Sequence, residues 1–231
     1  MKSNYSVSVI VPVYNEIALL ASALRRIDSF LADRFADYEL LVIESGSTDG
    51  TAALCDELAP TLPRLRVIHE GAKNGYGSAV KLGYRTAGKD LVWVITADLP
   101  FPLEAIERAL PLLAENACVL SFRSKDSRPP FRKIQSFFYN LLVRTFLDLR
   151  IRHVNSAFRV FKRDLIQSLR LRSDGWFIDA EVLYRLREQK THFAEIPVEL
   201  MERTAGHSTI GLLTPLQLIY DMLVFLQSDK A

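Results

Sequence analysis

The sequence predicts an α/β fold built on a doubly wound, mostly parallel sheet. Short runs of β-branched and other apolar residues alternate, through the first half of the chain, with segments whose apolar residues recur at helical spacing. The chain has 231 residues, of which 49% are hydrophobic and 24% charged, which is enough for one sizeable core. Neither an internal repeat nor a low-complexity linker divides it.

Strands and helices alternate over the first hundred residues. The first strand is expected over 7–13 (VSVIVPV), whose unbroken apolar character indicates burial on both faces of a parallel sheet. The other elements expected here are a helix over 19–31, a strand over 39–43, a helix over 51–58, a strand over 65–69, a helix over 77–86 and a strand over 91–95. Right-handed crossovers between these strands would form the doubly wound sheet.

The second half is less regular. We expect a helix over 103–113, a strand over 119–122, a polar loop over 124–132, an amphipathic helix over 134–149, helices over 164–169 and 178–188, a strand over 194–200 and a terminal helix over 215–226. Thr214 and Pro215 are residues typical of the N-cap and first position of a helix, which supports the start of the terminal one.

Composition excludes several classes of protein. A net charge of +2 does not favour a nucleic-acid partner. Cys55 and Cys118 lie far apart and in no metal-binding spacing, so we interpret them as buried thiols in a reducing compartment. No secretory signal precedes the first strand. The longest apolar stretch, 212–226, is shorter than the ~20 residues that cross a bilayer. Any contact with a membrane would therefore be peripheral.

Polar and glycine residues crowd the loops that follow the four predicted strands of the first half. These loops contain PVYNE, ESGSTDGT, the residues 69–77 and TADLP. Ligands of doubly wound sheets bind outside the carboxyl ends of the strands, so these loops are the first candidates for a site. ESGSTDGT can present backbone N–H groups to an anion at the start of a helix. A well-made turn without a ligand explains it equally well.

Gly75 and Gly77 precede a helix but lack the third glycine of a dinucleotide fingerprint, and they follow the third strand instead of the first. A dehydrogenase is therefore disfavoured.

Asp98 ends the fourth strand, where a diphosphate and a divalent cation would lie. Mg²⁺ binds carboxylate oxygens together with phosphate oxygens and waters, so one protein carboxylate can suffice. Considered alone, Asp98 is better explained as a cap for the next helix.

The order of the segments is what resembles a known family. VIVPVYNE, ESGSTDGT, KNGYGSA and TADLP are similar to the family 2 glycosyltransferases. SFRSKDSRPPFRKIQS, NSAFRVFKRDLI, FIDAEVLYRL, AEIPVE and ERTAGHST resemble the dolichol-phosphate and polyprenyl-phosphate mannosyltransferase branch. The likeness extends from about residue 7 to about residue 209. It implies the GT-A fold and an inverting transfer of a sugar from a nucleotide-sugar to an acceptor, either a lipid phosphate at a membrane surface or a glycan.

The resemblance also implies a division of the chain. Residues 1–209 would form the glycosyltransferase domain, with a nucleotide-sugar half over about 1–100 and an acceptor half over about 101–209. Residues 210–231 would form a C-terminal amphipathic helix.

Roles for individual residues follow from the same resemblance. The nucleotide-sugar would be bound by Pro12, Tyr14, Glu16, Glu44, Ser45, Lys73, Gly75, Gly77 and Arg203. Asp98 would be the acid of a metal-binding DxD motif that holds Mg²⁺ or Mn²⁺. Arg123 and Arg132 would hold the acceptor phosphate, because a guanidinium binds phosphate oxygens through two N–H groups. A hydroxyl acceptor would need a base, for which Asp179 or Glu181 is the candidate unless they are helix-surface or supporting residues.

Several residues depart from the family pattern. Thr96 and Pro100 replace an aspartate and a glutamine of the metal motif, and Ser45 replaces an acid that commonly contacts the base. His153, His207 and Thr209 stand where the family often has Asp, Glu and Lys. We expect a weakened metal site.

The main alternative to an active glycosyltransferase is therefore a non-catalytic nucleotide-sugar-binding or regulatory subunit. A nucleotidyltransferase would need a basic, glycine-rich loop where PVYNE stands. The sugar and the base stay open.

The stretch 132–152 interleaves apolar with basic residues, a pattern typical of a helix in the membrane interface. Its apolar residues include Phe137, Phe138, Leu141, Leu142 and Phe146. We favour membrane contact over core packing, and we expect Arg144, Arg150 and Arg152 to be solvated surface charges. The terminal helix would be a second membrane contact or the face of a homodimer. The expected location is the cytoplasm, peripherally on the inner face of the membrane.

Overall fold

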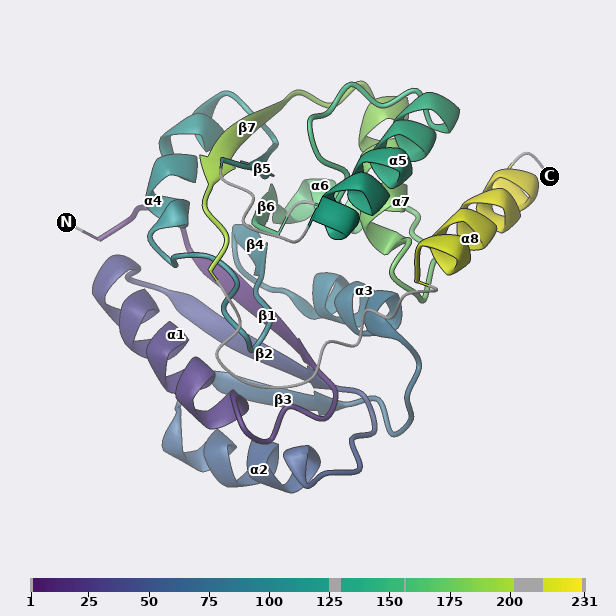
Figure 1. Cartoon of the computed structure of the whole chain (residues 1–231). Coiled ribbons are helices and arrows are strands. Elements are labelled where there is room, and N and C mark those ends of the chain that lie inside the picture. Colours follow the sequence, from purple (N-terminus) through teal and green to yellow (C-terminus); the bar gives the residue numbers. More distant parts are fainter. Residues whose placement is uncertain (1, 125–129, 156, 202–213, 230–231) are drawn as a thin grey trace.

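The structure, a computed structural model, describes residues 2–124, 130–155, 157–201 and 214–229. A seven-stranded sheet crosses the molecule in the order β3-β2-β1-β4-β6-β5-β7 (Figure 1). Its strands are β1 (Val7–Val13), β2 (Tyr38–Glu44), β3 (Leu65–His69), β4 (Leu91–Val94), β5 (Cys118–Arg123), β6 (Arg159–Lys162) and β7 (Phe193–Val198).

Helices cover both faces of the sheet (Figure 1). They are α1 (Leu20–Arg34), α2 (Thr51–Leu58), α3 (Tyr76–Thr86), α4 (Ala105–Ala109), α5 (Pro130–Phe146), α6 (Arg163–Ser168), α7 (Ile178–Glu188) and α8 (Thr214–Asp229), with 3₁₀ turns η1 (Ala59–Thr61) and η2 (Pro111–Ala114). The apolar cluster on one face includes α1, α2 and α4, and the cluster on the other includes α3, α5, α6, α7 and α8. The predicted doubly wound α/β fold is confirmed.

The central strands are buried on both faces, as their apolar sequences predict. In β1, Val9 contributes to the cluster beneath α1, whereas its neighbour Ile10 contributes to the cluster beneath α3. Trp93 of β4 is fully buried on the same face as Val9. Each such side chain stabilises the fold by about 1.5–3 kcal/mol relative to an exposed one, so both faces of the sheet hold the layers together.

Strand direction places most loops of interest at one edge of the sheet. Strands β1, β2, β3 and β4 are mutually parallel. Strand β6 is antiparallel to both β4 and β5, so β5 again runs in the direction of β4, and β7 is parallel to β5. The carboxyl ends of six strands therefore share one edge, where β6 begins.

Three elements differ from their predicted form. The helix expected over 103–113 is α4 followed by the 3₁₀ turn η2, because Pro111 has no N–H group for a continuing helix. Helix α5 begins at Pro130, inside the predicted polar loop, and proline suits the first turn of a helix. The rest of that loop, 125–129, lies outside the described residues. The prediction did not include β6.

Two expectations from composition can be checked. Cys55 and Cys118 are both buried and form no disulfide. In the described ranges, we find no helix that combines the length and the apolar character needed to cross a bilayer.

Gly83 allows α3 to lie close to β1. A Cβ atom added to it would lie 2.4 Å from Cγ2 of Ile10. We predict that Gly83→Ala lowers the free energy of unfolding by about 1 kcal/mol or more in urea denaturation, because the cost of overpacking exceeds the gain in helix propensity. Gly88→Ala is the control, since its Cβ would lie 3.5 Å from Glu39 Oε1, an ordinary contact. Equal loss in the two variants would contradict the prediction.

Candidate active site

The loops after β1 and β2 are fastened to each other. The backbone N–H of Ser45 donates to the carbonyl of Val13 at 3.1 Å. Asn15, with a φ of 55°, donates its N–H to Ser47 Oγ at 3.0 Å and accepts from the N–H of Thr48 at 2.8 Å. These bonds hold PVYNE beside ESGSTDGT, two of the predicted donor-binding segments.

Glu44 supports the second loop from within. Its side chain is buried, with Oε1 accepting from the N–H of Ser47 at 2.5 Å and Oε2 lying 2.9 Å from His69 Nδ1. Burial alone would raise the pKa of Glu44, but the bonds from His69 and Ser47 outweigh it and lower that pKa. The bond to Glu44, followed by that to Asp56, raises the pKa of His69. Both shifts favour the ionised pair.

The two shifts give this pair a definite pH range. A lowered Glu44 pKa contributes stability above the ordinary glutamate value of 4.5, and that stability is lost as pH falls through the folded value. A raised His69 pKa contributes stability that is complete below 6.5 and is lost as pH rises through the folded value. The loop is therefore held most firmly in mildly acidic solution.

Glu70 is a residue that sequence reasoning missed. Its carboxylate accepts from the hydroxyls of Ser45 and Ser78, both at 2.6 Å, and so joins the loop after β2 to the start of α3. Ser45 replaces an acid of the family pattern, and Glu70 supplies a carboxylate that contacts that position. The signal that the sequence offered for Glu70 was an acidic residue directly after the third strand.

Gly75 and Gly77 bring the third loop against the segment 173–175. Gly75 has a φ of 100°, and a Cβ added there would lie 2.4 Å from the carbonyl oxygen of Asp174. A Cβ on Gly77 would lie 2.6 Å from the carbonyl oxygen of Ser173. These glycines are thus required for close backbone packing. Their predicted place on the floor of a nucleotide pocket stays a prediction.

The side chains of Lys73 and Tyr14, two residues predicted to bind the donor, contact each other. The Lys73 Nζ atom lies 4.1 Å from the centroid of the Tyr14 ring, a cation–π distance. Lys73 is exposed and Tyr14 half-buried. The loops after β1 and β3 therefore share an exposed positive charge, which is the electrostatic property a diphosphate requires.

Asp98 lies in a tight turn after β4, at the shared sheet edge. Its Oδ1 accepts from the Thr96 hydroxyl at 2.5 Å, and the N–H of Leu99, whose φ is 44°, donates to the Thr96 carbonyl at 3.0 Å. The N–H of Met201 donates to the carbonyl of Pro100 at 2.9 Å, so the segment after β7 returns to this turn. Arg203 follows two residues later and lies outside the described residues.

A buried ion pair lies at the start of β6. Arg159, the first residue of β6, pairs with Asp179 of α7 and donates to the Tyr76 hydroxyl at 3.1 Å. Tyr76 stacks on Trp176, with ring centroids 4.4 Å apart. Burial raises the pKa of Tyr76 to about 12, and the negative charges of Asp179 and Asp98 act in the same direction. The pair thus connects β6, α3 and α7 close to Asp98.

The two predicted base candidates have different surroundings. Burial raises the pKa of the Asp179 carboxyl, although Arg159 opposes the shift. Glu181 is fully buried, and its two oxygens accept from the N–H groups of Arg172 and Ser173 at 2.8 and 2.7 Å. Glu181 therefore supports the segment that packs on Gly75 and Gly77, which is the supporting role left open by the sequence.

The remaining predicted residues are only partly placed. Pro12 lies near the end of β1, paired with Ile43 of β2, and the N–H of Glu16 donates to Thr51 Oγ1 at 2.9 Å. Arg123 ends β5 at the same edge as Asp98 and is half-buried. Arg132 lies in the first turn of α5, but its side chain is outside the described part.

The described residues contain no group of three or more His, Cys, Asp or Glu side chains that could hold a metal ion unaided. Asp98 provides one carboxylate at the turn, and Thr96 a neutral hydroxyl that is already bonded to it. One carboxylate fits Mg²⁺ or Mn²⁺ when substrate phosphates and waters complete the coordination.

Comparisons with known proteins identify relatives of this chain. A model of glycosyl transferase family 2 matches residues 8–170. Glycosyltransferase AglD of Haloferax volcanii is 30% identical over 206 residues, which cover 84% of this chain and 32% of that protein. The undecaprenyl-phosphate mannosyltransferase of Micrococcus luteus is 27% identical over 216 residues, which cover 89% of this chain and 87% of that one. The chain thus spans about a third of the first relative and most of the second.

A solved structure shows the same fold. It is glucosyl-3-phosphoglycerate synthase from Mycobacterium tuberculosis in complex with Mn²⁺ and uridine-diphosphate-glucose. The TM-score is 0.70 at 22% identity, over 97% of this chain and 79% of that one. The expected GT-A fold is confirmed.

The buried pair generates a prediction about Asp179. Asp179→Asn should lower the free energy of unfolding by about 3–5 kcal/mol, because it leaves the Arg159 guanidinium buried without a counter-charge. Asp164→Asn is the control, because it removes a carboxylate from an exposed pair with Arg163 and should cost at most about 1 kcal/mol. Urea denaturation measures both. A variant Asp179→Asn with wild-type stability and no glycosyl transfer would show instead that Asp179 acts in the chemistry alone.

Proposed function

Because this chain belongs to glycosyl transferase family 2 and is a glycosyltransferase, we propose that it transfers a sugar from a nucleotide-sugar to the phosphate of a polyprenyl lipid at a membrane surface. The observation that carries the proposal is a set of hydrogen bonds at the sheet edge. These bonds join the loop after β2 to the loops after β1 and β3, and the Asp98 turn lies at the same edge. The loops that the family resemblance assigns to the donor are thus held together, although they are far apart in the sequence.

The donor half of the proposal uses the first three loops and Asp98. Lys73 offers a positive charge beside the Tyr14 ring, and the exposed residues 48–50 precede α2. A relative in fold is described in complex with Mn²⁺ and uridine-diphosphate-glucose. When bound, Mg²⁺ or Mn²⁺ held by Asp98 would neutralise part of the charge of the departing diphosphate.

The acceptor half uses the end of β5 and the start of α5. Arg123 stands at the shared edge, and Arg132 belongs to the helix that follows β5. The name of the Micrococcus luteus relative states that it acts on undecaprenyl phosphate. Its coverage of nearly the whole chain supports an acceptor of this class.

A lipid phosphate simplifies the chemistry required of the protein. One phosphate oxygen, already an anion, forms a bond to the anomeric carbon as the bond from that carbon to the donor diphosphate breaks. The electron pair of that bond leaves with the nucleoside diphosphate, and the in-line geometry inverts the anomeric centre. No proton need be removed, so Arg123 and Arg132 only position the acceptor and balance its charge. This chemistry does not call for Asp179 or Glu181 as a base.

The Thr96–Asp98 bond also supports a second candidate, a nucleotide-sugar-binding or regulatory subunit without turnover. The family pattern has a carboxylate where Thr96 has a hydroxyl, so one negative metal ligand is missing. Metal-stimulated hydrolysis of the donor by the purified chain would exclude this candidate.

Asp98 gives the direct test of the enzyme. We predict that Asp98→Ala lowers kcat/KM for transfer from a radiolabelled donor to polyprenyl phosphate by about 100-fold or more, the size of effect expected for a group that stabilises developing charge. Asp33→Ala, on the exposed surface of α1, is the control and should keep wild-type activity. Retention of full activity by Asp98→Ala would refute the assignment.

The membrane part of the proposal comes from the distribution of exposed apolar side chains. Ten large apolar side chains are exposed among the described residues, and eight of them belong to α5 or α8, which pack against each other. These eight are Ile134, Phe137, Phe138, Leu141, Phe146, Tyr220, Leu223 and Val224. We name them the α5–α8 apolar face. Such clustering is typical of a membrane or protein contact.

We predict that Phe137→Ser combined with Phe138→Ser weakens sedimentation of the protein with neutral phosphatidylcholine vesicles, because both rings are more than half exposed on this face. Ile17→Ser is the control, since Ile17 is an exposed apolar residue of the loop after β1. Equal binding of the double variant and the wild type would contradict the prediction that α5 contacts the membrane.

A further inference from the structure

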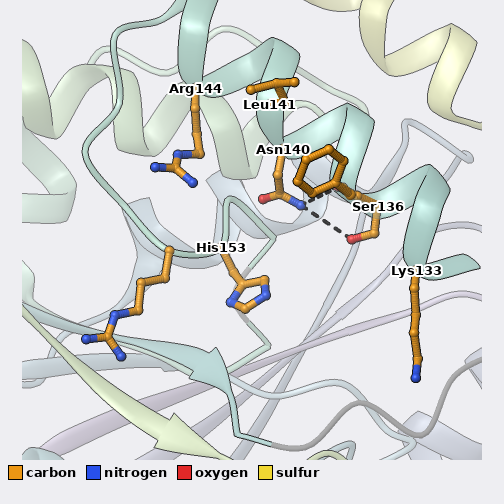
Figure 2. Close-up of a pocket in the computed structure, with 8 residues that line it drawn as sticks. Lys133, Ser136, Asn140, Leu141, Arg144 and His153 are labelled. Carbon is orange, nitrogen blue, oxygen red and sulfur yellow. Dashed lines mark hydrogen bonds between the residues drawn. The ribbon is translucent and has the colours of Figure 1, made fainter.

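A groove of about 190 Å³ lies between α5 and the segment that leads to β6 (Figure 2). Its lining comes from α5 and from the residues just before β6: Lys133, Ser136, Phe137, Asn140, Leu141, Arg144, Arg152 and His153. It is smaller than the roughly 300–1,000 Å³ of typical small-molecule sites, so it is too small for a nucleotide-sugar. It can hold a single compact group.

The lining of the groove is cationic. Lys133, Arg144 and Arg152 carry positive charge, and no carboxylate is among the described lining residues. Figure 2 shows Arg144 and Lys133 on α5 and His153 on the segment before β6, spaced along the groove that all three line. Three fixed charges around one hollow, in a protein with a net charge of +2, indicate a site for an anion.

Part of the lining is held in place by the fold. The guanidinium of Arg152 lies 4.1 Å from the centroid of the Phe122 ring at the end of β5. The Asn140 side chain donates to the Ser136 carbonyl at 2.7 Å and accepts from the N–H of Val154 at 2.8 Å. The groove is therefore built from two segments that are tied together.

The rim of the groove is apolar. Phe137 is 64% exposed and Leu141 50% exposed, and both belong to the α5–α8 apolar face. A soluble anion would gain no binding energy from this rim, because it has no apolar surface to bury there. A phospholipid would use both parts, because its phosphate needs positive charge and its acyl chains need an apolar surface beside it.

We propose that this groove binds the phosphate of an anionic phospholipid headgroup and thereby sets the orientation of α5 on an anionic membrane. This goes beyond the proposed function, because the lipid is neither donor nor acceptor and Arg123 is not among the described residues that line the groove. It also changes the expected role of Arg144 and Arg152, which the sequence alone suggests are solvated surface charges.

Sedimentation with two kinds of vesicle tests the proposal without donor or acceptor, so its result is independent of any failure to transfer sugar. One kind is phosphatidylcholine alone, and the other contains about one-fifth phosphatidylglycerol. The wild type should prefer the anionic vesicles. Arg144→Gln combined with Arg152→Gln should reduce binding to the anionic vesicles by roughly 10- to 30-fold and leave binding to neutral vesicles unchanged.

Arg25→Gln combined with Arg66→Gln is the matched control, because both arginines are exposed outside α5 and α8 and the change in net charge is the same. Lys133→Gln alone, on an exposed residue, tests the groove again if the double variant does not fold. A preference that survives both groove variants, or that falls equally in the control, overturns the proposal. Loss of the preference in millimolar inorganic phosphate at constant ionic strength, with equal binding of free phosphate, would also overturn it, because the occupant would then be a soluble anion.

Discussion

The buried ion pair between Arg159 and Asp179 is the interaction on which the rest of this site depends. It fixes the start of β6 against α7 and also holds the Tyr76 hydroxyl at the start of α3. Because β6 is the one strand of the described sheet that runs in the reverse direction, its position decides where β5 and β7 end. Taking two charges out of water is costly, and a pair of this kind is tolerated where each charge compensates the other.

The strands of the first half could be predicted because short apolar runs such as VSVIVPV and LVWV are typical of strands that are buried on both faces of a sheet. Strand β6 could not, because RVFK is four residues long, has charged ends and pairs with residues distant in the chain. The family resemblance, and no single local motif, predicted Asp98 and Lys73 as site residues, and their roles stay predictions. The links from Glu70 to Ser45 and from Glu181 to the backbone of Ser173 were not predictable, because each bond joins segments that only the tertiary fold brings together.

Two surfaces of different chemistry meet at the end of β5. The sheet edge is polar and holds the predicted donor loops, whereas the α5–α8 apolar face is rich in exposed aromatic and aliphatic side chains. Arg152 lies against Phe122, one residue before Arg123, and lines the cationic groove beside that face. The acceptor that we propose, a lipid phosphate, has a charged head and an apolar tail and would need both environments next to each other.

Diffraction from crystals grown with a nucleoside diphosphate and Mn²⁺ would locate the metal, since manganese has an anomalous signal. We expect a manganese peak beside the Asp98 carboxylate, with the diphosphate bound to the metal and the base between the loops after β1 and β2. A nucleotide bound away from this edge, or a manganese ion with no contact to Asp98, would contradict it.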